Sequence, residues 1–146
     1  MTRTVIDTNE LLRMAAGGER SQLAQHWRNR RLELLVSLST LTELRTVLAR
    51  PDIQRYFDPV VADEFLSLLE RHATVVQPDL SAPACRDPGD TALIATAVGG
   101  RADFLVSADP DLLDDPDLIH ALAKRGIRVV RAAEFLAHLA SSPAAE

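Results

Sequence analysis

The sequence predicts an α/β fold in which helices cover both faces of a parallel sheet. Short, apolar, β-prone runs alternate along the chain with longer segments of helical spacing. Such alternation favours parallel strands joined by right-handed crossovers. The 146 residues, 47% hydrophobic and 25% charged, suit one domain with its own core. We assign this domain to residues 1–140 and expect residues 141–146 to fray.

The predicted strands are short runs rich in Val, Ile, Leu and Phe, most of them closed by a polar or turn-forming residue. We expect them at residues 3–6, 34–36, 75–76, 104–106 and 127–130. The predicted helices repeat apolar residues three and four positions apart, and a Gly-Gly pair or Pro51 interrupts the spacing. We expect them at residues 9–16, 19–31, 39–50, 59–71, 90–98, 118–124 and 133–139.

Charge and cysteine content exclude several classes of protein. The net charge of -5 argues against a general nucleic-acid coat protein, which usually carries a basic balance. Cys85 is the only cysteine, so no internal disulfide can form and a reducing cytoplasm suits the chain. We find no signal-peptide core before Asp7 and no segment long enough to span a membrane. The basic residues form groups that either contact phosphate or face solvent: Arg28, Arg30 and Arg31; Arg45, Arg50 and Arg55; Lys124, Arg125, Arg128 and Arg131.

Acidic residues follow two predicted strands. Asp7 comes directly after the first strand, and Asp109 and Asp111 come just after the strand at 104–106. Carboxyl ends of parallel strands meet at one edge of a sheet, where ligands bind at the reversal of strand order. Asp7 could instead only cap the following helix, and Asp-Pro is ordinary turn chemistry.

Two further acids open predicted helices. Asp90 begins the helix at 90–98 and either caps it or faces the same edge, and Asp87 could do the capping instead. Glu43 follows Thr40 by three residues, which is the spacing of a capping box, but it also lies just past the strand at 34–36. Each acid therefore has a structural explanation of its own.

The combination is more specific than any single acid. Four or five carboxylates at one end of a sheet repel one another unless a cation holds them together. Oxygen ligands suit Mg²⁺ or Mn²⁺, whereas the scattered histidines lack the spacing of a zinc site. These histidines read as surface or helix-face residues: His26, His72, His120 and His138.

Four motifs in this order resemble those of PIN-domain ribonucleases. They are Val-Ile-Asp7-Thr-Asn9, Ser-x-x-Thr-x-x-Glu43-Leu, Asp90-Thr-Ala-Leu-Ile-Ala-Thr-Ala and Ala-Asp-Phe-Leu-Val-Ser107-Ala-Asp109-Pro-Asp111-Leu-Leu. The stretch Cys85-Arg-Asp-Pro-Gly-Asp90 is similar to the branch assigned as VapC-like toxins of toxin–antitoxin systems. The likeness covers nearly the whole chain.

The resemblance implies a three-layer α/β/α sandwich with a parallel sheet of about five strands. It also implies a metal-dependent endoribonuclease that uses Mg²⁺ or Mn²⁺, is inhibited by a cognate antitoxin and forms a homodimer. The family's acidic quartet corresponds to Asp7, Glu43, Asp90 and Asp109, with Asp111 as an auxiliary metal ligand. Supporting positions are Asn9 and Ser107, which orient the first and last acids, and Asp87, an extra acid of this branch. Glu10 departs from the family, which has an apolar residue there; it either adds charge at the rim or faces solvent.

Two other functions fit parts of the sequence. A catalytically silent PIN-fold binding module would keep the acids for folding or for a partner, although an intact quartet argues against it. A phosphatase with Asp7 as covalent nucleophile is disfavoured because position 9 is Asn and the usual Asp-x-Asp pair is incomplete.

Overall fold

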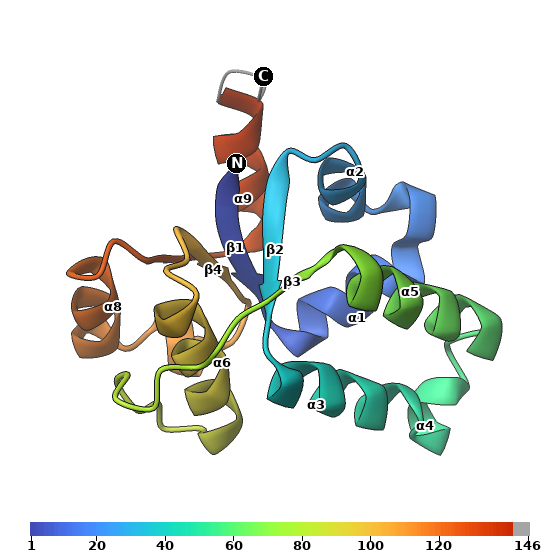
Figure 1. Ribbon diagram of the computed structural model, residues 1–146, viewed down its shortest axis with the longest axis horizontal. Coiled ribbons are helices and arrows are strands. Elements are labelled where there is room, and N and C mark those ends of the chain that lie inside the picture. The colour runs from blue at the N-terminus through green and yellow to red at the C-terminus, as the bar shows by residue number, and fades with distance from the viewer. Residues whose placement is uncertain (142–146) are drawn as a thin grey trace.

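In the computed structural model, which describes residues 1–141, five parallel strands form one sheet in the order β3-β2-β1-β4-β5 (Figure 1). The strands are β1 (Thr2–Ile6), β2 (Leu32–Val36), β3 (Thr74–Val75), β4 (Phe104–Val106) and β5 (Arg128–Val130). This confirms the predicted number and direction of the strands. Residues 142–146, where we expected most of the frayed tail, lie outside the described residues.

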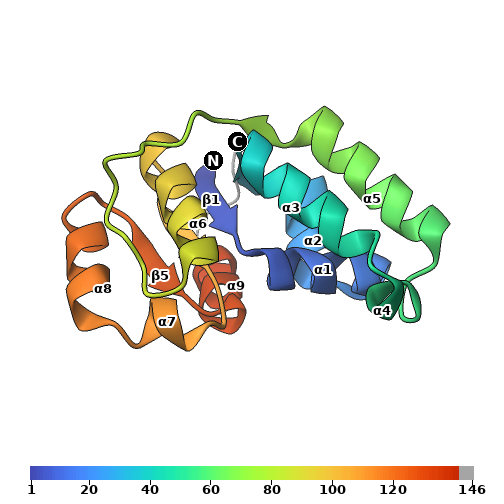
Figure 2. The ribbon, with the colours of Figure 1, turned by 90° about the horizontal axis from the view of Figure 1, so that it is seen from below.

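Helices cover both faces of this sheet, as the three-layer prediction requires (Figure 2). One face carries α1 (Thr8–Gly17), α2 (Gln22–Arg28), α3 (Leu38–Leu48), α4 (Pro51–Gln54), α5 (Pro59–His72) and α9 (Ala132–Ser141). The other carries α6 (Pro88–Gly99), α7 (Pro110–Leu113) and α8 (Pro116–Ala123). Successive strand residues alternate between the two cores: Ile6 packs in the first, and Val5 in the second. No helix within residues 1–141 combines the length and apolar character that a membrane crossing needs.

The strand order creates a switch point beside β1. The chain runs from β1 outward through β2 to β3, then returns to place β4 and β5 on the other side of β1. Ligands of open α/β sheets bind outside the carboxyl ends of the strands at such a reversal. Asp7 follows β1 and Ser107 follows β4, so these residues flank the switch point.

The predicted helices differ most clearly from the structure at two places. The single helix expected at 19–31 is instead a short 3-10 helix, η1 (Gly18–Arg20), followed by α2, because the Ser21 side chain caps α2 at Ala24 N. Pro51 does not simply end a helix at residue 50. Helix α3 already ends at Leu48, and Pro51 is the first residue of α4, where its fixed φ and missing N–H are tolerated.

Candidate metal centre

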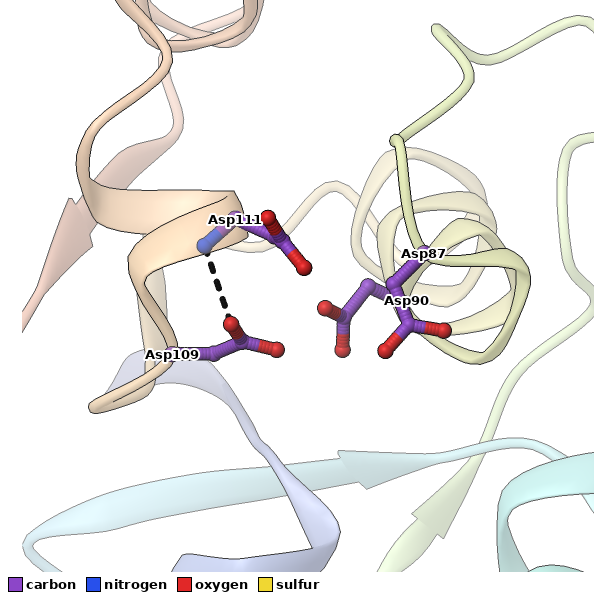
Figure 3. Close-up of side chains that lie close together, drawn as sticks. All are labelled: Asp87, Asp90, Asp109 and Asp111. Atoms are coloured by element: carbon purple, nitrogen blue, oxygen red, sulfur yellow. Dashed lines mark hydrogen bonds between the residues drawn. The ribbon is translucent and has the colours of Figure 1, made fainter.

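Four aspartates from the first turns of α6 and α7 lie together at the switch point (Figure 3). Each offers a carboxylate oxygen, and these oxygens all lie within 4.8 Å of one another: Asp87, Asp90, Asp109 and Asp111. Two of the four are helix caps. Asp87 accepts a hydrogen bond from Gly89 N at 2.9 Å to begin α6, and Asp109 accepts one from Asp111 N at 2.9 Å to begin α7.

Asp90 is the least satisfied member of this group. Because Asp87 caps α6, Asp90 is free of that role and points toward Asp109 (Figure 3). Its Oδ2 atom is buried and has no hydrogen-bond partner among the described residues. Burial, and then the neighbouring Asp109 carboxyl, raise the pKa of Asp90 to about 8. Contact with Asp90 lowers the pKa of Asp109, so at neutral pH the two face each other as one acid and one carboxylate.

Asp7 is held in place at the end of β1. Its side chain is buried, and Oδ1 accepts a hydrogen bond from Glu10 N at 2.8 Å, so Asp7 does cap α1. Its Oδ2 accepts a hydrogen bond from the Ser107 hydroxyl, and Ser107 Oγ in turn accepts one from Asp109 N at 3.0 Å. Ser107 therefore ties Asp7 to the backbone that carries Asp109. Each Asp7 oxygen keeps a further lone pair for a ligand.

A cleft of about 350 Å³ connects these groups. Its lining includes the whole predicted quartet: Asp7, Glu43, Asp90 and Asp109. The tight group differs from the predicted metal ligands in one member, because it contains Asp87 where the prediction had Asp7. Asp111 belongs to the tight group but does not line the cleft.

The capping-box interpretation of Glu43 is wrong. The box at the start of α3 is formed by Ser37 and Thr40: Ser37 N donates to Thr40 Oγ1 at 2.8 Å, and Thr40 N donates to Ser37 Oγ at 3.3 Å. Thr40 is thus the third helical residue and not the cap. Glu43 lies exposed one turn further along α3, where it lines the cleft opposite the aspartates.

Two residues near Asp7 are placed differently from what we expected. Asn9 lines the cleft as an exposed residue, and within the described chain the side-chain contact to Asp7 comes from Ser107. Glu10 does not face solvent: it is only 4% exposed and pairs with Arg13 at 2.7 Å. Burial raises the pKa of Glu10. Met14, four residues on, is also buried, so helical spacing alone could have placed Glu10 on the inner face.

Cys85 lies beside the aspartates without joining them. Its thiol contacts the backbone oxygen of Asp111 at 3.5 Å, and its backbone N donates to Thr91 Oγ1 at 3.1 Å. Burial, followed by the Asp90 and Asp111 carboxylates, raises the pKa of the Cys85 thiol, although nearby backbone hydrogen bonds act the other way. The thiol therefore stays protonated, and the available ligand atoms are oxygens.

This set of donors suits a hard divalent cation. The oxygens of the four carboxylates lie close enough together to bind one cation. The buried Oδ2 of Asp90 has no hydrogen-bond partner among the described residues, and a bound cation would provide one. The fold and the site together define a class: three-layer α/β/α domains with an acidic cleft at the switch point of a parallel sheet.

Comparison with known proteins identifies the family within this class. The PIN-domain family model matches residues 3–111, and the chain belongs to the PIN-domain family. PIN domains are usually metal-dependent nucleases. The crystal structure of PAE2754 from Pyrobaculum aerophilum is similar to this chain with a TM-score of 0.56 and 18% sequence identity, over 97% of this chain and 91% of that one, which supports the fold. A search of curated proteins finds no match.

Proposed function

We propose that this protein is a Mg²⁺- or Mn²⁺-dependent endoribonuclease that hydrolyses RNA phosphodiester bonds. The observation that carries the proposal is the buried, unpartnered oxygen of Asp90, facing Asp109 within a group of four carboxylates. A fold does not need such a group for its stability, because the carboxylates repel one another. Perturbed carboxyl groups in a cleft are typical of catalytic sites.

Asp90 and Asp109 would hold the cation, with Asp87 and Asp111 close enough to share it. A bound divalent cation lowers the pKa of water and stabilises charge on phosphoryl oxygens. Asp7, fixed by Ser107, would complete the cation site from the floor of the cleft.

Glu43 lies on the opposite wall, where it would orient the attacking water and take its proton. In-line attack by that water on phosphorus breaks the P–O3′ bond. The proton that Glu43 takes returns through solvent to the leaving oxygen, which becomes the 3′-hydroxyl, and the other product keeps a 5′-phosphate.

The choice of RNA rests on the family resemblance of the four motifs. The same resemblance, through the stretch from Cys85 to Asp90, supports a cytoplasmic, homodimeric toxin that a cognate antitoxin inhibits. An antitoxin that presents a basic side chain to the carboxylates would replace the charge of the cation.

The test is the variant Asp7→Asn, assayed on single-stranded RNA with Mn²⁺. We expect cleavage to fall at least about 100-fold because the charge at the floor of the cleft is lost. Circular dichroism should stay unchanged because the amide oxygen can still accept from Glu10 N and the amide NH2 can donate to Ser107 Oγ. Asp103→Asn, at the opposite edge of the sheet, is the matched control and should retain activity. Undiminished, EDTA-resistant cleavage by Asp7→Asn would contradict the proposal.

A binding module without catalysis is the competing function. Wild-type protein that binds Mn²⁺ in calorimetry but cleaves no RNA would favour it.

A further inference from the structure

The wall of the cleft opposite the aspartates comes from α3 and α4. Glu43, Val47 and Arg50 line the cleft from α3 and from the junction that follows it, and Ile53 lines it from α4. Glu43 and Val47 are four positions apart and so lie on one face of α3, and Arg50 follows as the extended residue between α3 and α4.

Arg50 differs in charge from the rest of the cleft. Among the lining residues that the structure describes, it is the only basic one, whereas Asp7, Glu43 and three aspartates of the tight group are acidic. One divalent cation neutralises two of these five carboxylates. A polyanionic RNA strand therefore needs a further cation in the cleft, and Arg50 is the described lining residue that can supply it.

The guanidinium of Arg50 is already oriented. Its Nε donates to Asp52 Oδ1 at 3.2 Å and its Nη2 donates to Asp52 Oδ2 at 2.9 Å. This bidentate pair uses two of the five N–H groups and leaves both on Nη1 and one on Nη2. The Arg50 side chain is 56% exposed, so the pair adds little stability; in the structure it orients the guanidinium and leaves these three N–H groups free of Asp52.

The lining next to Arg50 is apolar. Val47 and Ile53, three positions before and after Arg50, line the cleft, and Leu12 of α1 also belongs to the lining. An apolar surface beside a preoriented guanidinium suits one nucleotide, whose phosphate binds Arg and whose ribose or base lies on apolar groups.

We propose that Arg50 binds a backbone phosphate of the RNA strand that flanks the scissile one, and thereby holds the strand along the α3–α4 wall. This inference rests on the proposed function, because it takes RNA as the substrate. Arg50 is then a substrate-binding residue, and the RNA strand runs across the cleft from the aspartates to the start of α4.

The test measures binding of a fluorescent single-stranded RNA oligonucleotide to the Asp7→Asn protein by anisotropy over a range of salt concentrations. We expect Arg50→Gln in this background to weaken binding about tenfold at low salt, as for the loss of a charged hydrogen bond. The slope of log affinity against log salt should fall by about 0.7, the value for one phosphate contact on a single strand. A merely structural role of the Arg50–Asp52 pair would leave this slope unchanged.

Arg45→Gln is the matched control. Arg45 lies on α3, five residues before Arg50, is 55% exposed and also pairs with an acid, Glu70, but it does not line the cleft. It should leave affinity and slope unchanged, and Arg50→Lys, which keeps the charge, should keep the slope. The inference is overturned if Arg50→Gln binds as tightly as its parent, if Arg45→Gln weakens binding as much, or if the parent binds no RNA. Failure of the wild type to cleave RNA would instead overturn the proposed function, because these binding measurements do not depend on cleavage.

Discussion

Charged side chains are arranged in opposite ways at the amino and carboxyl ends of the strands, which we call the amino edge and the carboxyl edge of the sheet. At the amino edge, Arg3 Nη1 binds both carboxylate oxygens of Glu33, at 3.0 and 3.1 Å, and Arg3 N donates to Asp103 at 2.8 Å. Thr74 Oγ1 also donates to Glu33, at 3.0 Å. Acids and donors are therefore matched where β1, β2 and β4 begin.

At the carboxyl edge the acids gather without such matching. Asp90 keeps an unpartnered buried oxygen, and the guanidinium nearest the group, that of Arg86, approaches only Asp111, at 3.6 Å. The described residues of one sheet thus pair their acids with donors at one end, whereas at the other end four acids cluster around a single arginine contact. The difference indicates that the carboxyl edge is built for a ligand rather than for stability.

The largest effect that sharpens this comparison is the pH dependence of metal binding. Below a pH of about 8 Asp90 holds a proton, which a cation must displace. We therefore expect the affinity for Mn²⁺ to rise with pH between 6 and 8, by up to about tenfold per pH unit for one displaced proton. Calorimetry in buffers of different ionisation enthalpy measures both the affinity and the proton release. The same affinity at pH 6 and pH 8 would contradict the role of Asp90.

The next effect is a gain of stability when Asp90 is neutralised. The pKa of Asp90 is about 8 in the folded chain and 3.8 in an ordinary environment, so the folded state binds more protons between these values. The free energy of unfolding must then fall as pH rises from about 4 to about 8. Without metal, Asp90→Asn should raise it by about 1–2 kcal/mol at pH 8 and much less at pH 5. Urea denaturation at both pH values measures this, and a loss of stability at pH 8 would refute it.

The smallest effect belongs to the amino edge. Glu33→Gln removes the charge that Arg3 binds, and we expect the free energy of unfolding to fall by about 0.5–1 kcal/mol because the pair is only half-buried. The loss should be the same at pH 6 and pH 8. Thermal unfolding of the two variants side by side gives the comparison directly: Glu33→Gln should be destabilised where Asp90→Asn is stabilised. If both variants were stabilised, or both destabilised, at pH 8, the contrast between the two edges would not hold.

The sequence was sufficient for the sheet because its signals are local. Each strand is a short apolar run, and the residues after β1 and β4 are polar. Since all strands are parallel, residues that follow strands must meet at one edge. Asp7 and Asp109 could therefore be placed in one cleft without any knowledge of side-chain packing.

Helix starts were harder, because several residues can cap the same helix. Ser37 and Thr40 are both good caps, and Thr40 with Glu43 matches the capping-box spacing, but α3 begins directly after β2 and so uses Ser37. Proline was an underused signal, because only the helix at 59–71 was predicted to begin at one. Five prolines occupy the first position of a helix: Pro51, Pro59, Pro88, Pro110 and Pro116. If Pro88 is taken as the first residue of α6, Asp87 is its N-cap and the Asp90 side chain is not needed for capping.

The other residues that the sequence did not place at the site depend on tertiary contacts. Arg50 was one member of a basic group that could equally face solvent, and only the packing of α3 and α4 beside α1 brings it to the cleft. The approach of Asp87 to Asp109 likewise depends on how the long loop before α6 folds. Neither arrangement has a local sequence signal.

Cys85 lies where its reactivity should depend on whether the cleft holds a cation. The thiol is the only one in the protein, and the carboxylates of Asp90 and Asp111 contribute to its raised pKa. A cation that neutralised these carboxylates would lower the pKa of the thiol and increase the fraction present as thiolate, which is the form that reacts with alkylating agents. The rate of alkylation at this single atom would then report the occupancy of the cleft, without substrate and without any added label.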